Sequence, residues 1–283
     1  MNLNEYLQEN YTKQTAKAYQ REIEIYISNN KKSEHYTYSE IINYIGILRK
    51  RYRNPQTINR ILASIKAYYS YLCFIRLRND NPSKSIRLRD KISRDIQLQD
   101  LFTTEELETL LTAKKERYKA LEMRNKVLIS LLIYQALKPQ EIEQIQAQDI
   151  DLAQATIYIK SSPKNNARTL NLKANQILLF QMYLEQLNTA KSPSFGGVGE
   201  VFIPMTANDI AKHIKRNYKL FKNRNLNCQT IRQSVIANLL KQGHDLRIVQ
   251  AFSGHKYPST TERYKQNDVV ALQQQINVFH PMR

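Results

Sequence analysis

The chain has 283 residues, with 43 lysines and arginines against 25 aspartates and glutamates, so its formal net charge is +18. Because 42% of the residues are hydrophobic, the chain can build ordinary cores, which excludes a disordered polycation. Domains usually span about 100–200 residues, so this length favours two domains. Only six glycines and eight prolines occur, which favours a mainly helical chain with few tight turns.

The sequence also excludes a membrane span and a cysteine-based site. The longest apolar run, residues 127–137, has 11 positions, whereas a membrane-spanning helix needs about 20 residues. Cys73 and Cys228 stand apart without ligand-like neighbours, so neither a disulfide framework nor a zinc site is predicted. The first residues lack the basic and apolar segments of a signal peptide. We therefore expect a cytoplasmic protein with no membrane and no metal partner.

The positive charge is concentrated in one part of the chain. Residues 49–94 contain 13 lysines and arginines and only two acidic residues. The apolar stripe in this region is that of a core-facing helix, so nucleic acid is a better partner than an anionic membrane. The alternative is a solvated basic face that serves only solubility. As a group, the expected phosphate contacts are Arg51, Arg53, Arg60 and Lys66.

Helical periodicity organises the first part of the chain. Apolar residues recur at helical spacing over residues 12–30, 38–50 and 54–72, and a short helix is expected at 3–7. Asn54 and Pro55 supply the cap and the first residue of the third long helix. These elements predict a helical bundle over residues 1–90. Residues 91–99, rich in alternating charges, are the expected linker.

A second domain is expected from residue 100 to 283. Thr103 and Glu106 form a capping box that starts its first helix. Residues 156–160 and 168–172 alternate around the polar turn SSPKNNA, which predicts a β-hairpin, with residues 201–203 as the candidate third strand. Other segments are predicted to be helical, and Ser259 with Glu262 is expected to cap a last helix that carries Tyr264.

The most distinctive segment is residues 229–266. It contains Q-T-I-R (229–232), L-L-K-Q-G (239–243), G-H (254–255) and S-T-T-E-R-Y (259–264). This order resembles the tyrosine recombinases, or phage integrase family, and especially their Xer type, whose signature is H-x-x-R, L-L-x-x-G, G-H and S-T-T-x-x-Y. The steps of 23 residues from Arg232 to His255 and nine from there to Tyr264 also match. Further similar segments are ALKPQEIEQIQAQDIDL, TKQTAKAY, QTINRILASIKAYYSYL and the ending HPMR.

The resemblance implies both a fold and an activity. The fold is mainly α, with an N-terminal four-helix SAM-like core-binding domain (1–90) and an α+β tyrosine-recombinase catalytic domain (100–283) with a small β-sheet. The activity is that of a site-specific recombinase or integrase, which binds double-stranded DNA and rejoins strands through a 3′-phosphotyrosyl intermediate. It implies a homo- or hetero-tetramer on DNA in which the tail after residue 267 docks on a neighbouring subunit. Neither a cofactor nor a metal is implied.

The resemblance also assigns roles to particular residues. Tyr264 is the nucleophile, and a tyrosine of ordinary pKa near 10 needs cations around the phosphate to act. Arg232 clamps the non-bridging oxygens, and His255 bonds the phosphate or helps to move the tyrosine proton. Lys164 in the hairpin turn protonates the 5′-hydroxyl leaving group. Lys160 is the alternative, because the hairpin is one residue longer than the usual pattern.

Two positions depart from the family pattern. Lys138 stands where the family has its first arginine, and Gln229 stands where it has the histidine of H-x-x-R. Lysine keeps the charge but replaces a planar fork by a point donor, and glutamine can bond phosphate but cannot carry a proton. The alternatives are therefore a slow enzyme, an enzyme that depends on a partner subunit, or a DNA-binding paralogue that keeps the clamp without cleavage. A type IB topoisomerase-like relaxation activity is a further alternative.

Overall fold

The computed structural model describes residues 1–90, 100–112, 116, 118–189, 201–216, 220–221 and 224–264. The chain divides into two compact units, Met1–Arg94 and Asp95–Arg283. The expected linker (91–99) and the tail after residue 267 lie outside the described residues. Each unit has its own hydrophobic core.

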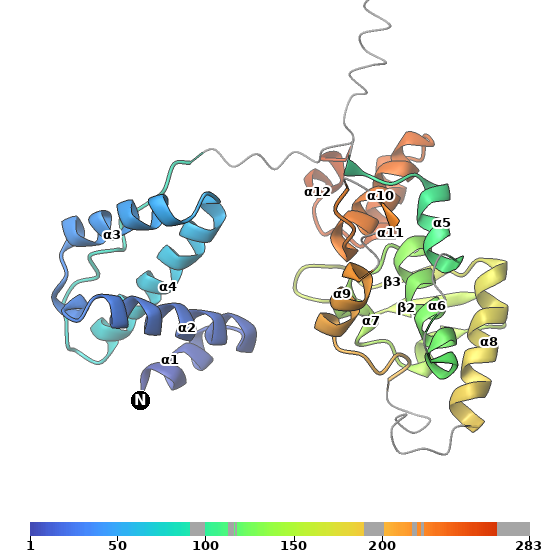
Figure 1. Cartoon of the computed structure of the whole chain (residues 1–283), viewed down its shortest axis with the longest axis horizontal. Helices are drawn as coiled ribbons and strands as arrows, with labels where there is room; N and C mark the ends of the chain where they lie inside the picture. The colour runs from blue at the N-terminus through green and yellow to red at the C-terminus, as the bar shows by residue number, and fades with distance from the viewer. Residues whose placement is uncertain are drawn as a thin grey trace, which may run out of the picture. The chain divides into compact units, whose positions relative to one another are not determined.

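The first unit is a helical bundle (Figure 1). Its helices are α1 (Leu3–Asn10), α2 (Lys13–Asn29), α3 (Tyr38–Arg51) and α4 (Pro55–Phe74), with a 3₁₀ turn at Ser33–His35. The four predicted helices are confirmed. Asn54 accepts a hydrogen bond from the Gln56 amide at 2.9 Å, and Pro55 begins α4, as the cap signal predicted. Helix α4 packs against each of the other helices and forms the centre of the unit.

Two buried tyrosines connect the helices of the first unit. The Tyr69 hydroxyl donates to the Ser33 carbonyl at 2.7 Å, and the hydroxyls of Tyr26 and Tyr69 lie 2.8 Å apart. Because Tyr69 has one proton and gives it to Ser33, Tyr26 must be the donor in the second bond. Both tyrosines are fully buried, so these two hydrogen bonds satisfy hydroxyls that have no access to water. They fix α2 and α4 to the turn before α3.

The second unit places helices around a small sheet (Figure 1). Its elements are α5 (Thr104–Thr112), α6 (Lys119–Tyr134), α7 (Pro139–Ile142), a 3₁₀ turn (Ala147–Asp149), β1 (Ile150–Asp151), β2 (Thr156–Ile159), β3 (Arg168–Asn171), α8 (Ala174–Thr189), α9 (Ala207–Lys215), α10 (Cys228–Lys241), α11 (Leu246–Ser253) and α12 (Pro258–Glu262). Helix α6, which is continuously buried from Val127 to Ile133, packs against α5, α8 and α10. The capping box before α5 is confirmed, since Thr103 and Glu106 exchange backbone-to-side-chain bonds of 2.9 and 3.2 Å.

The sheet has three antiparallel strands in the order β1-β2-β3. The predicted hairpin is confirmed, with Ile157 opposite Leu170 and Ile159 opposite Arg168. The predicted strand at residues 201–203 is wrong, because the third strand is the two-residue β1. Phe202 and Ile203 are both fully buried, so this segment lacks a strand's alternation; the Phe202 amide bonds the Ile145 carbonyl at 2.8 Å.

The predicted start of the last helix is also wrong. Helix α12 begins with Tyr257 as N-cap and Pro258 as its first residue, not with Ser259. Proline has a helical φ and needs no hydrogen-bond acceptor for its nitrogen, so it determines the start. The helix ends at Glu262, so Tyr264 follows α12 in a turn, where its amide bonds the Thr261 carbonyl at 3.0 Å. Among the described residues, no helix is both long and apolar enough to cross a bilayer.

The tyrosine chain predicts unequal costs for two substitutions. Tyr69→Phe leaves the Tyr26 hydroxyl without a partner and leaves the Ser33 carbonyl only its bond from the Tyr36 amide, so the local free energy of unfolding should fall by about 2–3 kcal/mol. Tyr26→Phe keeps the bond to Ser33 and should cost about 1 kcal/mol. Hydrogen exchange of the α2 and α4 amides measures both values in the full chain. Equal losses would contradict the direction assigned to the bonds.

Candidate active site

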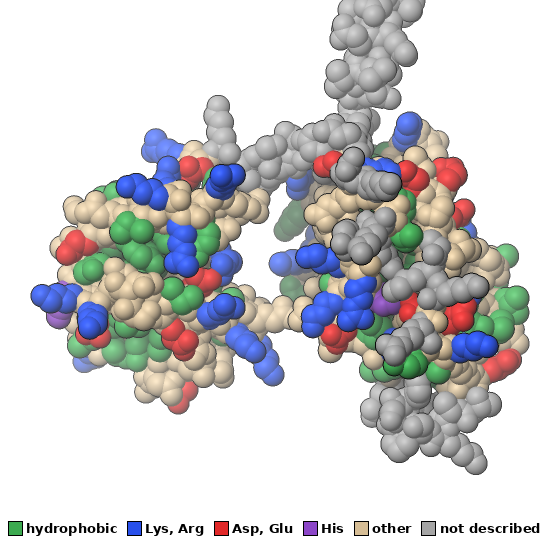
Figure 2. All heavy atoms as spheres, viewed as in Figure 1, with side chains coloured by type: hydrophobic (Ala, Val, Ile, Leu, Met, Phe, Trp, Pro, Cys, Tyr) green, Lys and Arg blue, Asp and Glu red, His purple; other side chains and the backbone are tan. Residues whose placement is uncertain are grey.

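A polar cleft of about 290 Å³ opens in the second unit. Its walls come from the start of α7, the β2–β3 turn, α10, and the segment from the end of α11 to Tyr264. All six catalytic residues predicted from the sequence line it: Lys138, Lys164, Gln229, Arg232, His255 and Tyr264. Six further lining residues were not predicted: Asn165, Gln233, Lys256, Tyr257, Thr260 and Arg263. Figure 2 shows lysine and arginine side chains gathered on one side of the visible face of this unit.

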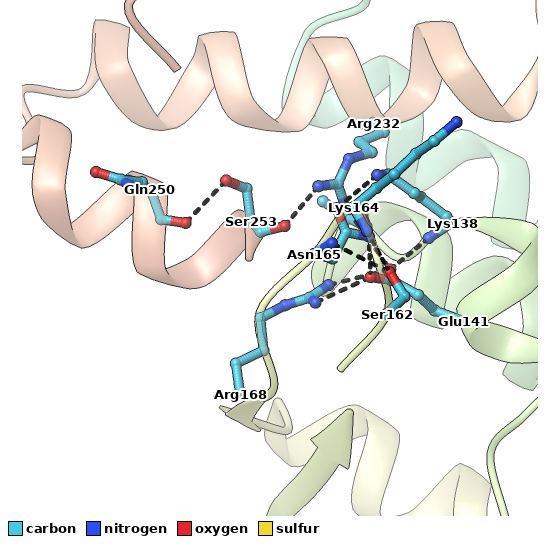
Figure 3. A network of polar contacts seen from close by, with 10 residues as sticks. Lys138, Glu141, Ser162, Lys164, Asn165, Arg168, Arg232, Gln250 and Ser253 are labelled. Atoms are coloured by element: carbon cyan, nitrogen blue, oxygen red, sulfur yellow. Dashed lines mark hydrogen bonds and ion pairs between the residues drawn. The ribbon is translucent and has the colours of Figure 1, made fainter. Parts of the chain in front are cut away.

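The carboxylate of Glu141, which is 7% exposed, anchors the polar network behind the cleft (Figure 3). Its Oε1 accepts from Asn165 Nδ2 at 2.8 Å and from an Arg168 nitrogen at 2.9 Å. Its Oε2 accepts from the Lys138 amide at 2.9 Å and from the other Arg168 nitrogen at 3.1 Å. Burial alone would raise the pKa of Glu141, but the bonds and charge of Arg168 outweigh it and hold the pKa below its usual value. The carboxylate therefore remains charged and compensates the surrounding cations.

Arg232 projects from α10 and is 2% exposed. Its guanidinium donates to the carbonyls of Ala136 and Ser253, and it lies 3.9 Å from the Glu141 carboxylate. Burial lowers the pKa of Arg232, and Glu141 opposes that shift. Ala136, which follows α6, adopts a left-handed conformation (φ 50°). The backbone at the end of α6 thus supplies an acceptor that orients the arginine.

Lys138 is the N-cap residue of α7 and is partly buried. Its ammonium donates to Asn165 Oδ1 at 2.7 Å. Burial lowers the pKa of Lys138 to about 8, helped by the positive charge of Arg232 and opposed by Glu141. Lys138 is therefore charged at neutral pH but loses its proton in a more acidic range than an ordinary lysine.

His255 and Tyr264 lie side by side in the cleft. Their rings stack with centroids 6.1 Å apart and an interplanar angle of 18°, and His255 Nδ1 lies 2.9 Å from Thr261 Oγ1. Burial lowers the pKa of His255 to about 3, assisted by Arg232 and Lys138, so the imidazole is neutral. Burial also raises the pKa of Tyr264, against the charges of Arg232 and Arg263. In the free protein a neutral phenol therefore lies beside a neutral imidazole, and burial and the nearby cations oppose protonation of that imidazole.

The two candidate hairpin lysines have different surroundings. Lys164 is exposed in the turn and lines the cleft. Lys160 instead pairs with Asp149 at 3.3 Å and donates to Gln146 Oε1 at 2.8 Å, among residues that line another pocket. The geometry therefore favours Lys164 over Lys160 for a role in this cleft.

The hairpin turn is attached to the turn that carries His255. The Asn166 amide donates to the Gly254 carbonyl at 2.9 Å, and Asn165 forms a β-bridge with His255. Gly254 has a φ of +70°, and a Cβ there would lie 2.5 Å from the Arg168 guanidinium. Glycine is thus required in the G-H dipeptide for its backbone conformation and for the close approach of Arg168.

The remaining cleft residues include several that sequence reasoning missed. Gln233 lies on α10 one turn after the predicted Gln229, which is exposed near the start of that helix. Lys256 follows the G-H dipeptide directly, and Arg263 precedes Tyr264. Their adjacency to motif residues was a signal that could have identified them.

The predicted phosphate contacts of the first unit have differing local partners. Arg51, the last residue of α3, stacks over Tyr52 at 5.4 Å, and Arg53 is exposed in the bend that follows the helix. Arg60 pairs with Glu22 at 2.8 Å. Lys66 donates to the backbone carbonyls of residues 84 and 86 at 3.3 and 2.6 Å, which ties the segment after α4 to that helix. Lys66 thus has a structural contact that the sequence did not predict.

Gly254→Ala should destabilise the second unit. A Cβ would force a left-handed alanine and displace Arg168 from its buried partner Glu141, so we expect a loss of about 2–4 kcal/mol. Gly46→Ala is the matched control, because Gly46 lies in α3 and a Cβ added there would meet nothing within 4 Å. That exposed helical substitution should raise stability by up to about 1 kcal/mol. Thermal unfolding of the full chain compares the two variants, and similar effects would contradict the role given to Gly254.

Comparisons with known proteins find relatives that match most of the chain, including the segments that form the cleft. The profile described as "Phage integrase family" matches residues 100–270. The chain is 28% identical over 295 residues to tyrosine recombinase XerC of Rickettsia prowazekii, covering 98% of this chain and 94% of that protein. It is 25% identical over 288 residues to tyrosine recombinase XerD of Halalkalibacterium halodurans, covering 94% and 91%.

Two solved structures share the fold. XerH site-specific recombinase bound to its difH substrate is 20% identical, with a TM-score of 0.64 and coverage of 92% of this chain and 77% of that chain. The Tn1549 transposon integrase in complex with transposon right end DNA is 15% identical, with a TM-score of 0.65 and 99% coverage of both chains. The predicted fold class, mainly helical with a small sheet, is confirmed.

Proposed function

We propose a DNA strand-exchange function on the premise that the chain belongs to the phage integrase family, whose profile covers residues 100–270, more than half of the 283 residues. The family predicted from the motifs is thereby confirmed. The chain is a tyrosine recombinase, a site-specific recombinase or integrase that cleaves and rejoins DNA through a 3′-phosphotyrosyl intermediate. The observation that carries this function is the convergence of Tyr264, Arg232, His255 and Lys164 on one cleft.

The chemistry begins with a phosphodiester held in the cleft. Arg232 and Lys138 donate to its non-bridging oxygens, where negative charge is present and develops further. The Tyr264 oxygen attacks phosphorus, so that the Tyr–O–P bond forms and the bond to the 5′-oxygen breaks. The negative charge of the bound phosphate offsets the cations that lower the pKa of His255 in the free protein, so that neutral His255 can take the phenolic proton. Lys164 gives a proton to the departing 5′-oxygen. Gln229 donates a hydrogen bond to a phosphate oxygen but transfers no proton.

The charge of the cleft supports a polyanionic substrate. Five of its lining residues are lysine or arginine: Lys138, Lys164, Arg232, Lys256 and Arg263. Concave sites with one sign of charge focus the field and raise the local concentration of oppositely charged ligands. Residues 1–90 then act as the core-binding domain, in which Arg51, Arg53, Arg60 and Lys66 contact the duplex backbone. Residues 91–99 link this domain to the catalytic domain at 100–283.

The assembly on DNA is a tetramer in which the tail after residue 267 docks on a neighbouring subunit. A groove of about 160 Å³ in the second unit is a suitable acceptor, because its lining includes the apolar side chains of Leu107, Ile133, Val235 and Phe252. The tail sequence carries apolar residues, among them Leu272, Ile276 and Phe279. Burying these residues in the groove removes apolar surface from water.

A recombinase acts where the DNA is, and we propose the cytoplasm as the compartment of this protein.

The second candidate is a DNA-binding paralogue or partner subunit without cleavage. Lys138 and Gln229 favour it, because the loss of one preorganised donor typically costs about 10²–10³ in rate. Type IB topoisomerase-like relaxation uses the same chemistry and differs in its products. Assays of the protein's reaction with DNA distinguish the recombinase, the non-cleaving paralogue and the topoisomerase.

The test uses duplexes selected by the protein from a random library, with a nick beside each candidate cleavage position so that cleavage cannot be reversed. The wild type should form a covalent protein–DNA adduct on gels, and Tyr264→Phe should abolish it without weakening binding. Tyr158→Phe is the matched control, because Tyr158 is a partly exposed tyrosine of β2 outside the cleft. Tight binding without any adduct would favour the DNA-binding paralogue, and relaxation of a supercoiled plasmid without recombinants would favour a topoisomerase.

Lys138 makes DNA affinity depend on pH. Its pKa is about 8 in the free protein, and a bound phosphate raises it because the charged form gains a partner. Binding therefore takes up a proton above pH 8, and the dissociation constant should rise by up to about tenfold per pH unit there. Lys138→Arg stays charged and should remove this dependence. Fluorescence anisotropy between pH 7 and 9.5 measures it, and identical profiles for both proteins would disprove the contact.

A further inference from the structure

We propose that Asn165 is a positioning residue that holds the Lys138 ammonium in place as a phosphate donor by linking it to the buried carboxylate of Glu141. The phosphate-binding part of this proposal rests on the proposed function. The link between the two side chains is a property of the free protein and can be tested without DNA.

The orientation of the Asn165 amide follows from its neighbours. An ionised carboxylate only accepts hydrogen bonds, so the Asn165 NH₂ group must face Glu141, at 2.8 Å. An ammonium only donates, so the carbonyl oxygen must face Lys138 Nζ, at 2.7 Å. The two contacts require the same orientation of the amide. The negative charge of Glu141 and the position of Lys138 are therefore connected through one side chain.

Asn165 is itself immobilised. It is 3% exposed, and its backbone pairs with Ser162 in both directions, through bonds of 2.9 and 3.2 Å. The backbone amide of Asn165 also donates to the Ser162 hydroxyl at 3.1 Å, and a β-bridge joins Asn165 to His255. A side chain fixed on so many sides supplies a rigid acceptor rather than a chance surface contact.

A lysine needs such an acceptor more than an arginine does. Its ammonium is a point charge on a flexible stem, and it lacks the planar fork that orients a guanidinium on phosphate. Asn165 uses one of the three N–H donors of Lys138, and two remain for phosphate oxygens in the cleft. The acceptor also stabilises the charged form of a partly buried lysine. Lysine in place of the family's arginine at position 138 is thus accompanied by an acceptor, Asn165, that fixes the lysine side chain.

The first experiment measures the titration of Lys138 in the free full-length protein. Trace acetylation with acetic anhydride at a series of pH values, read by mass spectrometry of the Lys138 peptide, gives its midpoint. Asn165→Leu keeps the branched shape and the number of heavy atoms but removes the acceptor, so the midpoint should move down by about one pH unit from its wild-type value. Asn166→Ala is the matched control, because Asn166 is exposed in the same turn, and it should leave the midpoint unchanged. Should Asn165→Leu fail to fold, Asn165→Ser, which is too short to reach Lys138, should shift the midpoint in the same direction.

The second experiment separates positioning from general structure. Asn165→Leu should lower the rate of adduct formation on the nicked duplex by about 10- to 100-fold in the wild-type background. In a Lys138→Met background, where the positioned group is absent, the same substitution should change the rate less than about threefold. Equal losses in both backgrounds, or an unmoved acetylation midpoint, would overturn the proposal. Absence of any adduct in the wild type would count against the proposed function, while the acetylation result would still decide the role of Asn165.

Discussion

The buried carboxylate of Glu141 is the interaction on which the catalytic unit depends. Arg168, Arg232 and Lys138 bring positive charge to a poorly hydrated place, and such charges repel one another strongly there unless an anion compensates them. Glu141 contacts the α7 backbone, the hairpin residue Asn165 and strand β3 at once. It therefore fixes α7 relative to the β2–β3 hairpin, whose contacting residues lie 24 and 27 positions further along the chain. Removing it would leave Arg168, Arg232 and Lys138 without this counter-charge.

The same carboxylate explains how the cleft can be both cationic and ordered. A phosphate site needs donors that are already aimed before the substrate arrives, because reorganisation during the reaction reduces the electrostatic benefit. Arg232 is aimed by the carbonyls of Ala136 and Ser253, and Lys138 by Asn165. In each case a neutral acceptor directs the cation while Glu141 supplies the compensating charge. The departure from arginine at position 138 changes the donor but keeps this division of roles.

Much of the fold could be predicted from local sequence signals. The long helices of the first unit follow from apolar periodicity and from the Asn54–Pro55 start, and the hairpin follows from alternation around SSPKNNA. Errors occurred where those signals are weak. Strand β1 has two residues, too few for any alternation, and α12 begins at a proline one residue before the serine that resembles a cap.

The residues of the candidate site also divide into those that local sequence signals identified and those that they missed. Motif spacing found Arg232, His255 and Tyr264, because their separations are fixed by helix lengths and turns. Glu141, Asn165 and Arg168 were missed, since their partners lie 24 to 27 residues away and only the folded chain brings them together. Arg168 did carry one signal, its inward position on an alternating strand, but alternation does not identify the partner of a buried charge.

The attachment of the hairpin to the Gly254–His255 turn has a consequence for the timing of cleavage. Lys164, the proposed proton donor to the leaving group, and His255, the proposed acceptor of the tyrosine proton, stand on segments joined by the Asn166–Gly254 bond and the Asn165–His255 bridge. A movement that withdraws the hairpin must break this joint or carry the histidine turn with it. As long as these backbone contacts hold, the two segments that carry the proposed acid and the proposed base move together rather than independently.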